Sequence, residues 1–223
     1  MADEASDQAL LTTLTTEHFA LQGARSQTVS EKASSASLYL FSVSSSLVAL
    51  GFVAQATAGG DLFRVFALIV LPTLYTLGIF TFVRQVETSI EDLLYGRAIN
   101  RIRHYYLELA GERARYFMMS GNDDVPGVLR NMGLGLTPSR WQLHFTAATA
   151  TAVVNSVIGG TAVGFAVGVA TDPPLGVSVA AGAVFALASV ALHMRIDRAR
   201  HGRGVEEEPI FPTPGVEGDR PAG

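Results

Sequence analysis

The residues that could carry acid–base or metal chemistry are few and widely spaced. The chain contains no cysteine, which excludes disulfides, thiolate metal sites and cysteine nucleophiles. Among the five histidines, His104 shares one helical face with two acidic residues, Glu108 and Glu112. Such a row could hold a metal, but it is more often a solvated helix face with ion pairing between positions i and i+4. We therefore predict neither a metal nor a cofactor.

Sequence motifs for other chemistries are also missing. There is no Glu-x-x-His pair, no His-Glu-x-x-His motif, no Gly-x-Ser-x-Gly elbow, no Walker loop and no dinucleotide-binding fingerprint. The net charge of −4 argues against a nucleic-acid-binding protein, which would present a clustered basic face. These observations favour a protein that is not an enzyme and does not bind nucleic acid.

The elements that position these residues are apolar segments. Hydrophobic residues make up 48% of the 223 residues and charged residues 16%, against about 25% charged in soluble proteins. Four segments lack charge almost completely and are long enough to cross a bilayer as helices. The predicted fold is all-α, with four transmembrane helices in two hairpins and a cytoplasmic helical layer. The first hairpin covers 38–83, with spans 38–58 and 63–83; the second covers 143–194, with spans 143–170 and 175–194.

A row of small residues marks the third span. Between Leu143 and Ala170 there is no Asp, Glu, Lys or Arg, and small residues recur at every fourth position. Small side chains at this spacing let transmembrane helices approach closely. The residues of the row are Ala148, Ala152, Ser156, Gly160, Gly164 and Gly168, and a second row in the fourth span comprises Ser178, Gly182 and Ala186.

The six-membered row cannot face a single straight partner along its whole length. Each four-residue step advances about 40° around a helix, so the row drifts by about 200°. We expect part of the row to pack on the fourth span of the same chain. The remainder would meet another helix of the chain or a second protomer, which makes a homo-oligomer an open alternative.

Polar residues in the first two spans allow a pore as a second interpretation. Ser42 and Ser46 share a helix face, and Pro72 lies near the middle of the second span. Serine in a membrane helix commonly bonds to its own backbone, and proline commonly produces a static kink. The alternative is a pore lining with a hinge. Deeply buried ionisable groups, typical of ion-coupled transporters, are missing from the spans, in which Asn155 is the most polar side chain.

The segments outside the spans are predicted to be cytoplasmic. Residues 1–37 contain an amphipathic helix over Asp7–Lys32, and 84–142 contain a long helix followed by a Gly- and Pro-rich loop. The apolar stripe within 84–119 needs a partner, either the helix over Asp7–Lys32 in a coiled-coil pairing or a separate cytoplasmic protein. Residues 195–223 are expected to form a disordered tail.

The distribution of basic residues predicts the orientation in the membrane. If both termini are cytoplasmic, 15 of the 16 basic residues lie inside and only Arg64 lies outside. We therefore expect a multi-pass protein of the plasma membrane that contacts the lipid bilayer directly. The leading functional hypothesis is a non-enzymatic protein that acts through close helix packing. The alternatives are an oligomeric ion channel or membrane-permeabilising effector and, third, a lipid-modifying enzyme.

Overall fold

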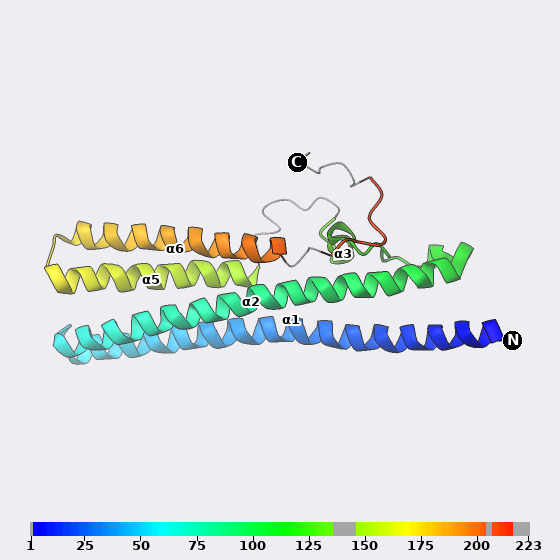
Figure 1. The fold of residues 1–223 in the computed structure, drawn as a ribbon. Helices are drawn as coiled ribbons and strands as arrows, with labels where there is room; N and C mark the ends of the chain where they lie inside the picture. Colours follow the sequence, from blue (N-terminus) through cyan, green and yellow to red (C-terminus); the bar gives the residue numbers. More distant parts are fainter. Residues whose placement is uncertain (1, 136–145, 204–206, 216–223) are drawn as a thin grey trace. The chain divides into compact units, whose positions relative to one another are not determined.

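The computed structural model describes residues 2–135, 146–203 and 207–215, and all regular structure among them is helical (Figure 1). Four of the helices are long and apolar enough to cross a membrane, which indicates a multi-pass helical membrane protein. The chain divides into two compact units. Unit 1 comprises residues 1–30, 88–144 and 204–223, and unit 2 comprises residues 31–87 and 145–203.

Helix α1 (Ala2–Ala56) joins two segments that the sequence predicted separately. The amphipathic helix over Asp7–Lys32 and the first span form one continuous helix, because residues 24–50 contain neither glycine nor proline. The helix ends where Ala58 and Gly59 adopt positive φ angles of 48° and 74°. The Gly59 amide then donates to the Ala54 carbonyl oxygen at 3.0 Å, a helix termination typical of glycine in the left-handed conformation.

Helix α2 (Asp61–Ala110) also runs from an apolar half into a charged half without interruption. Pro72 lies inside it and is exposed. The helix ends before Gly111, whose φ of +52° is accessible to glycine at little cost. A short 3₁₀ helix, η1 (Gly111–Tyr116), follows.

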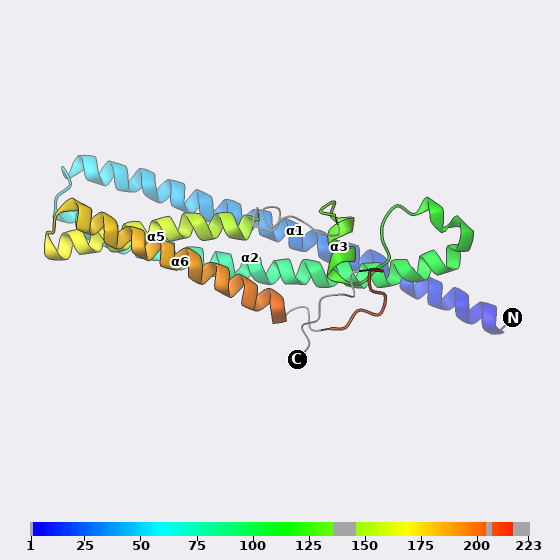
Figure 2. The same cartoon turned by 90° about the horizontal axis from the view of Figure 1, so that it is seen from above.

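Helices α5 (Ala147–Thr171) and α6 (Leu175–Arg203) form an antiparallel pair connected by a short turn (Figures 1 and 2). The Thr146 hydroxyl accepts a hydrogen bond from the Thr149 amide and caps the start of α5. At the other end Asp172 adopts a left-handed conformation with φ of 45°, and two prolines follow it. Helix α6 extends nine residues beyond the predicted end of the fourth span.

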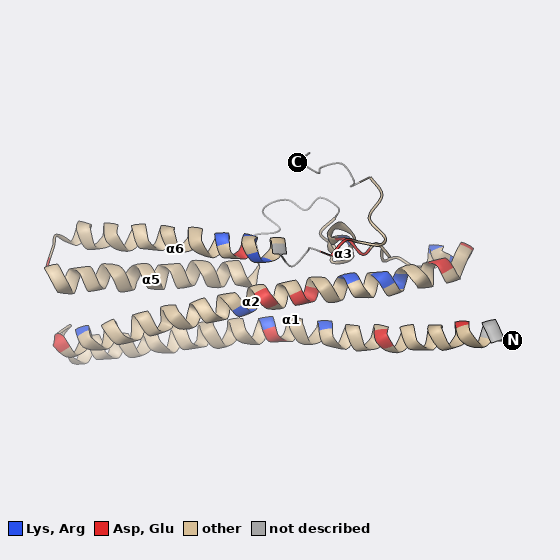
Figure 3. Ribbon diagram, in the orientation of Figure 1, with Lys and Arg blue, Asp and Glu red and all other residues tan. Residues whose placement is uncertain are grey.

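Unit 2 combines parts of four helices around an apolar core. Its buried members come from α1, α2 and α5: Tyr39, Val43, Leu50, Ala67, Leu71, Leu74 and Ile158. Phe63 and Phe165 meet edge to face at the margin of this core, with their ring centroids 5.7 Å apart. Figure 3 shows that α5 carries no charged side chain and that charges on α6 are confined to its C-terminal part.

Unit 1 contains the first part of α1, the second part of α2, η1 and α3 (Val125–Asn131). Arg25 of α1 pairs with Asp92 of α2 at 2.9 Å, and the ring of His18 lies 5.8 Å from that of Tyr106. Val128 of α3 packs directly over Gly96 of α2. Asp92, Gly96 and Tyr106 of α2 therefore contact other segments of unit 1.

The C-terminal segment differs from the expectation of a disordered tail from residue 195 onward. Residues 195–203 belong to α6, and residues 207–215 lie against the loop before α3 (Figure 1). The physical reason is a set of hydrogen bonds to Asp123 and Asp124. Composition alone does not reveal these partners, because they lie almost 90 residues away in the sequence. The first three residues of the predicted third span, 143–145, fall outside the described residues.

Candidate functional site

A cluster of neutral polar side chains lies inside the apolar bundle of unit 2, and we call it the polar cluster. Its first part joins α1, α2 and α5. The Tyr39 hydroxyl donates to Asn155 Oδ1 at 3.0 Å, and both side chains are almost completely buried. Gly78 of α2 provides the space for this pair. A Cβ at position 78 would overlap Asn155 Oδ1 and lie 2.7 Å from the Tyr39 hydroxyl oxygen.

The second part of the polar cluster joins α2, α5 and α6. The Ser189 hydroxyl lies 3.0 Å from the Tyr75 hydroxyl and 3.0 Å from the Ser156 hydroxyl. Gly159 makes room for Tyr75, since a Cβ at position 159 would lie 2.6 Å from the tyrosine ring. Because Asn155 and Ser156 are adjacent in α5, the polar cluster connects all four helices of unit 2. Hydrogen bonds of this kind contribute about 0.6 kcal/mol each within a membrane.

His193 lies at the end of the polar cluster on α6. Its Nδ1 is 2.7 Å from the Ser189 carbonyl oxygen, one turn earlier in the same helix. This geometry requires a proton on Nδ1, because a carbonyl oxygen can only accept. The Ser189 hydroxyl is farther from Nδ1, at 3.4 Å. Nδ1 thus cannot act as a general base toward Ser189, and the pair does not form an activated serine nucleophile. The ring packs edge to face on Phe82, with centroids 4.6 Å apart.

The two rows of small residues meet where α5 and α6 are in contact. A Cβ added to Gly160 would lie 2.5 Å from the Gly182 carbonyl oxygen, and one added to Gly164 would lie 2.7 Å from the Ser178 carbonyl oxygen. The backbones are thus too close for a larger residue at either position. At the other end of the row Ala148, Ala152 and Ser156 are buried in the bundle. Gly168 and Ala186 also lie in this contact, opposite Ser178 and Gly160 respectively.

An open groove of about 910 Å³ follows the same helix pair. Its walls include Gly160, Gly164, Gly168 and Gly182, together with apolar side chains such as Val157 and Val179. Arg64 of α2 and Asp172 line the end of the groove near the turn between α5 and α6. The small residues therefore have two consequences: they bring α5 and α6 together, and they leave a surface depression beside the contact.

The residues considered for a pore lie on α1 and α2. The Ser42 hydroxyl donates to the Leu38 carbonyl oxygen at 2.8 Å, which satisfies it within α1. Ser46 lies one turn further along the same helix. Pro72 is on an exposed part of α2, where the Thr76 hydroxyl donates to its carbonyl oxygen at 2.9 Å. None of these three residues lines the groove along α5 and α6.

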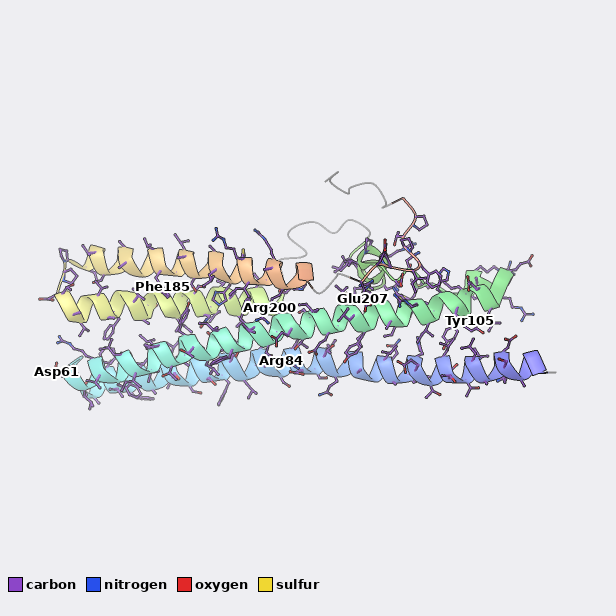
Figure 4. The ribbon with its side chains drawn as sticks, viewed as in Figure 1. Asp61, Arg84, Tyr105, Phe185, Arg200 and Glu207 are labelled. Carbon is purple, nitrogen blue, oxygen red and sulfur yellow. The ribbon has the colours of Figure 1, made fainter. Side chains whose placement is uncertain are left out.

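Ion pairs link three helices of unit 2 beyond the uncharged segments. Arg84 of α2 pairs with Glu31 of α1 at 2.6 Å, and Glu87 of α2 pairs with Arg200 of α6. Figure 4 labels both arginines, Arg84 within α2 and Arg200 toward the C-terminal end of α6. All four side chains are more than one third exposed, so the pairs align the helices and add little to stability.

Sequence reasoning singled out Asn155 and the small residues, but not the groups that surround them. Tyr39, Tyr75 and Ser189 resemble ordinary interface or packing residues in an apolar segment. The available signal was the coincidence of isolated polar residues with Gly78 and Gly159, because glycine inside a membrane helix marks close approach by another group. In the possible metal row, His104 Nε2 lies 3.7 Å from Glu108 Oε1, and the described residues contain no group of three or more His, Asp or Glu side chains that could hold a metal ion.

Comparisons of the chain with protein-family models, curated proteins and solved structures find no match.

Proposed function

We propose that this chain is a non-catalytic, multi-pass membrane protein that acts through close packing of its helices. The observation that carries the proposal is the approach of α5 and α6, where the Gly160 and Gly164 positions lie against the carbonyl oxygens of Gly182 and Ser178. In lipid, helices associate through such contacts and through interhelical hydrogen bonds, because the surrounding chains are as apolar as the helix surfaces. The polar cluster supplies those hydrogen bonds between all four helices.

The proposed arrangement is two transmembrane hairpins in the plasma membrane, with both termini and the charged helical segments in the cytoplasm. The arginine distribution supports this orientation, since Arg64 is the single basic residue near the outer turns. The charged halves of α1 and α2 would then form the cytoplasmic helical layer. A cysteine-free chain makes the orientation testable, because single cysteines at Gly59 and Gly215 can be labelled from opposite sides of sealed vesicles.

We further propose that copies of the chain associate through the groove beside the α5–α6 contact. Small residues line this groove, and a helix from a second protomer would gain close van der Waals contact there. The groove lies on the helices with the most extensive small-residue surface, so self-association would extend the packing that already holds the chain together.

Replacement of Gly164 by leucine tests the proposal. The larger side chain would collide with the Ser178 carbonyl oxygen, so we expect lower thermal stability and altered oligomer size in detergent. Gly176→Leu is the matched control, because position 176 is also helical and has no other atom within 4 Å of an added Cβ. Equal stability and equal size of the two variants would contradict the proposal.

The oligomeric channel remains the competing hypothesis, and it predicts a different measurement. A channel would conduct ions after reconstitution into planar bilayers, and its conductance would respond to substitution of Ser42, Ser46 or Pro72. Under the packing proposal we expect no ion conductance, because the hydroxyl groups of the polar cluster bond to one another inside the bundle.

A further inference from the structure

The segment over residues 207–213 packs against the loop before α3 and against α2, within unit 1, in the manner of an extended peptide ligand. Asp123 is the centre of this contact and is fully buried. Its carboxylate accepts hydrogen bonds from the amides of Ile210 and Phe211 at 3.1 and 2.7 Å. The Asp123 amide donates in return to the Phe211 carbonyl oxygen at 3.1 Å. One residue of unit 1 thus recognises three backbone groups of the segment.

The Asp123 carboxylate is held in its charged form. Burial alone would raise the pKa of this carboxyl group, but the amides of Phe211 and Ile210 and the Arg101 guanidinium outweigh it and hold the pKa below its usual value. Arg101 Nη2 lies 2.8 Å from Asp123 Oδ2, the oxygen that also accepts from the Ile210 amide. Charge-assisted hydrogen bonds of this kind are stronger than neutral ones.

Asp124 adds selectivity for the side chain of Thr213. The Thr213 amide donates to Asp124 Oδ2 and its hydroxyl donates to Oδ1, both at 2.7 Å. Thr213 is 5% exposed, so the site encloses this side chain. Asp124 Oδ1 also accepts from the Gly127 amide and caps α3, which fixes the carboxylate in position.

Further contacts surround the aromatic residue of the segment. The ring of Phe211 stacks on that of His104, with centroids 3.7 Å apart and an angle of 11° between the planes. The Asn122 side-chain amide donates to the Pro212 carbonyl oxygen at 3.0 Å, and Arg97 donates to the Glu207 carbonyl oxygen at 2.7 Å. Arg97 is itself buried, and its Nε donates to the Asp123 carbonyl oxygen. The site therefore contacts the backbone of the segment, the ring of Phe211 and the hydroxyl of Thr213.

We propose that unit 1 contains a peptide-recognition site for an extended aromatic–proline–threonine segment, and that residues 207–213 of the chain are its separable ligand. Proline residues at 209, 212 and 214 favour an extended conformation before binding, which lowers the entropy lost on docking. The proposal is independent of the helix packing in unit 2, because none of the contacts that form the site comes from that unit.

Binding of a synthetic peptide to the full-length protein tests the site. A fluorescent peptide with the sequence of residues 207–215 is titrated into a full-length Phe211→Ala/Thr213→Val variant in detergent, in which the tethered segment lacks the stacking ring and the hydroxyl. We expect saturable binding by anisotropy. The same peptide with valine at position 213 keeps the shape of threonine but lacks the hydroxyl donor, and we expect it to bind about tenfold more weakly.

If the peptide of residues 207–215 shows no saturable binding, or if the two peptides bind with equal affinity, the proposal is overturned. A second measurement covers the case in which the double variant does not fold. Hydrogen exchange of the Ile210, Phe211 and Thr213 amides is compared between the unaltered chain and Asp124→Asn, whose side chain has one carbonyl acceptor in place of two carboxylate oxygens. We expect protection in the unaltered chain and faster exchange at Thr213 in the variant. Rapid exchange of these amides in the unaltered chain would contradict the site.

Discussion

In unit 2 the buried polar side chains are neutral and bond to one another across helices, whereas in unit 1 the central buried groups are charged and bond largely to backbone. Tyr39, Asn155 and Ser189 exemplify the first pattern. Asp123 and Arg97 exemplify the second. A charge inside lipid is expensive, whereas the buried charges of unit 1 are stabilised by backbone groups and by an opposite charge. The difference in buried chemistry matches the difference in hydropathy along α1 and α2.

Two kinds of glycine occur in both units: those that allow close approach and those that adopt a positive φ angle. In unit 2, Gly78, Gly159 and Gly160 are positions where another helix or side chain occupies the space of a Cβ. In unit 1, Gly111 and Gly133 have positive φ angles and open space around them. Close approach also occurs in unit 1, where Val128 lies over Gly96 and the Asn122 carbonyl oxygen lies over Gly127, and a positive-φ glycine also occurs in unit 2, at Gly59. Alanine substitutions can separate the two kinds of glycine. At a close-approach position the added methyl group meets a neighbouring atom, and at a positive-φ position it strains the backbone.

The largest effect should come from Gly78→Ala. A single methyl group at this position would overlap Asn155 Oδ1, so the Tyr39–Asn155 hydrogen bond must break or the helices must separate. We expect a loss of about 1–3 kcal/mol in the free energy of unfolding, measured by unfolding titration in mixed micelles. Gly51→Ala in α1 is the control, since nothing lies within 4 Å of its added Cβ. Equal stability of the two variants would disprove the steric role of Gly78.

A smaller loss is expected for Ser189→Ala. The substitution removes the hydroxyl that both Tyr75 and Ser156 approach at 3.0 Å. At about 0.6 kcal/mol for each hydrogen bond in a membrane, the free energy of unfolding should fall by about 1 kcal/mol. Ser45→Ala, on an exposed face of α1, should have no comparable effect. A stability unchanged by Ser189→Ala would mean that the polar cluster does not contribute to helix association.

The buried charge of Asp123 in unit 1 predicts that the segment over residues 207–215 is released at low pH. The pKa of Asp123 is lower in the folded chain than in the unfolded chain, so its contribution to docking is complete at neutral pH. That contribution is lost as the pH falls through the folded pKa, below the ordinary value of about 3.9. Protease cleavage within residues 207–215 should accelerate in that acidic range. In Asp123→Asn the cleavage rate should no longer increase as the pH falls through this range. If the increase persists in that variant, a group other than Asp123 causes it.

The smallest effect is expected at the exposed pair of Arg64 and Asp61. Their closest charged atoms are 3.5 Å apart, and the side chains are 54% and 95% exposed. We therefore expect Arg64→Gln to change the free energy of unfolding by less than about 0.5 kcal/mol, as measured by the same titration. A larger loss would show that Arg64 has a further partner at the groove that it lines.

Periodicity and charge were sufficient to predict an all-helical chain with four apolar helices, because each apolar segment exceeds the length that a bilayer requires. They could not predict that α1 is continuous from Ala2 to Ala56, since the change from amphipathic to apolar composition resembles a boundary. Asn155 was noticed as unusually polar, but its partner Tyr39 lies 116 residues away. The ordered segment over residues 207–215 was also missed, because its stability comes from Asp123 and Asp124 and not from its own composition.

The central claim, that the small-residue rows pack within one chain, is tested most directly by a disulfide between α5 and α6. An added Cβ at Gly168 lies 4.0 Å from the Cβ of Ser178, within the range of a disulfide, and the chain has no native cysteine. In Gly168→Cys/Ser178→Cys we predict rapid oxidation to an intrachain disulfide in the membrane, detected as a monomer that no longer reacts with maleimide. Gly168→Cys/Val177→Cys, with the second cysteine on an exposed position, should remain reduced. A disulfide-linked dimer, or two reactive thiols, in the first pair would contradict the account.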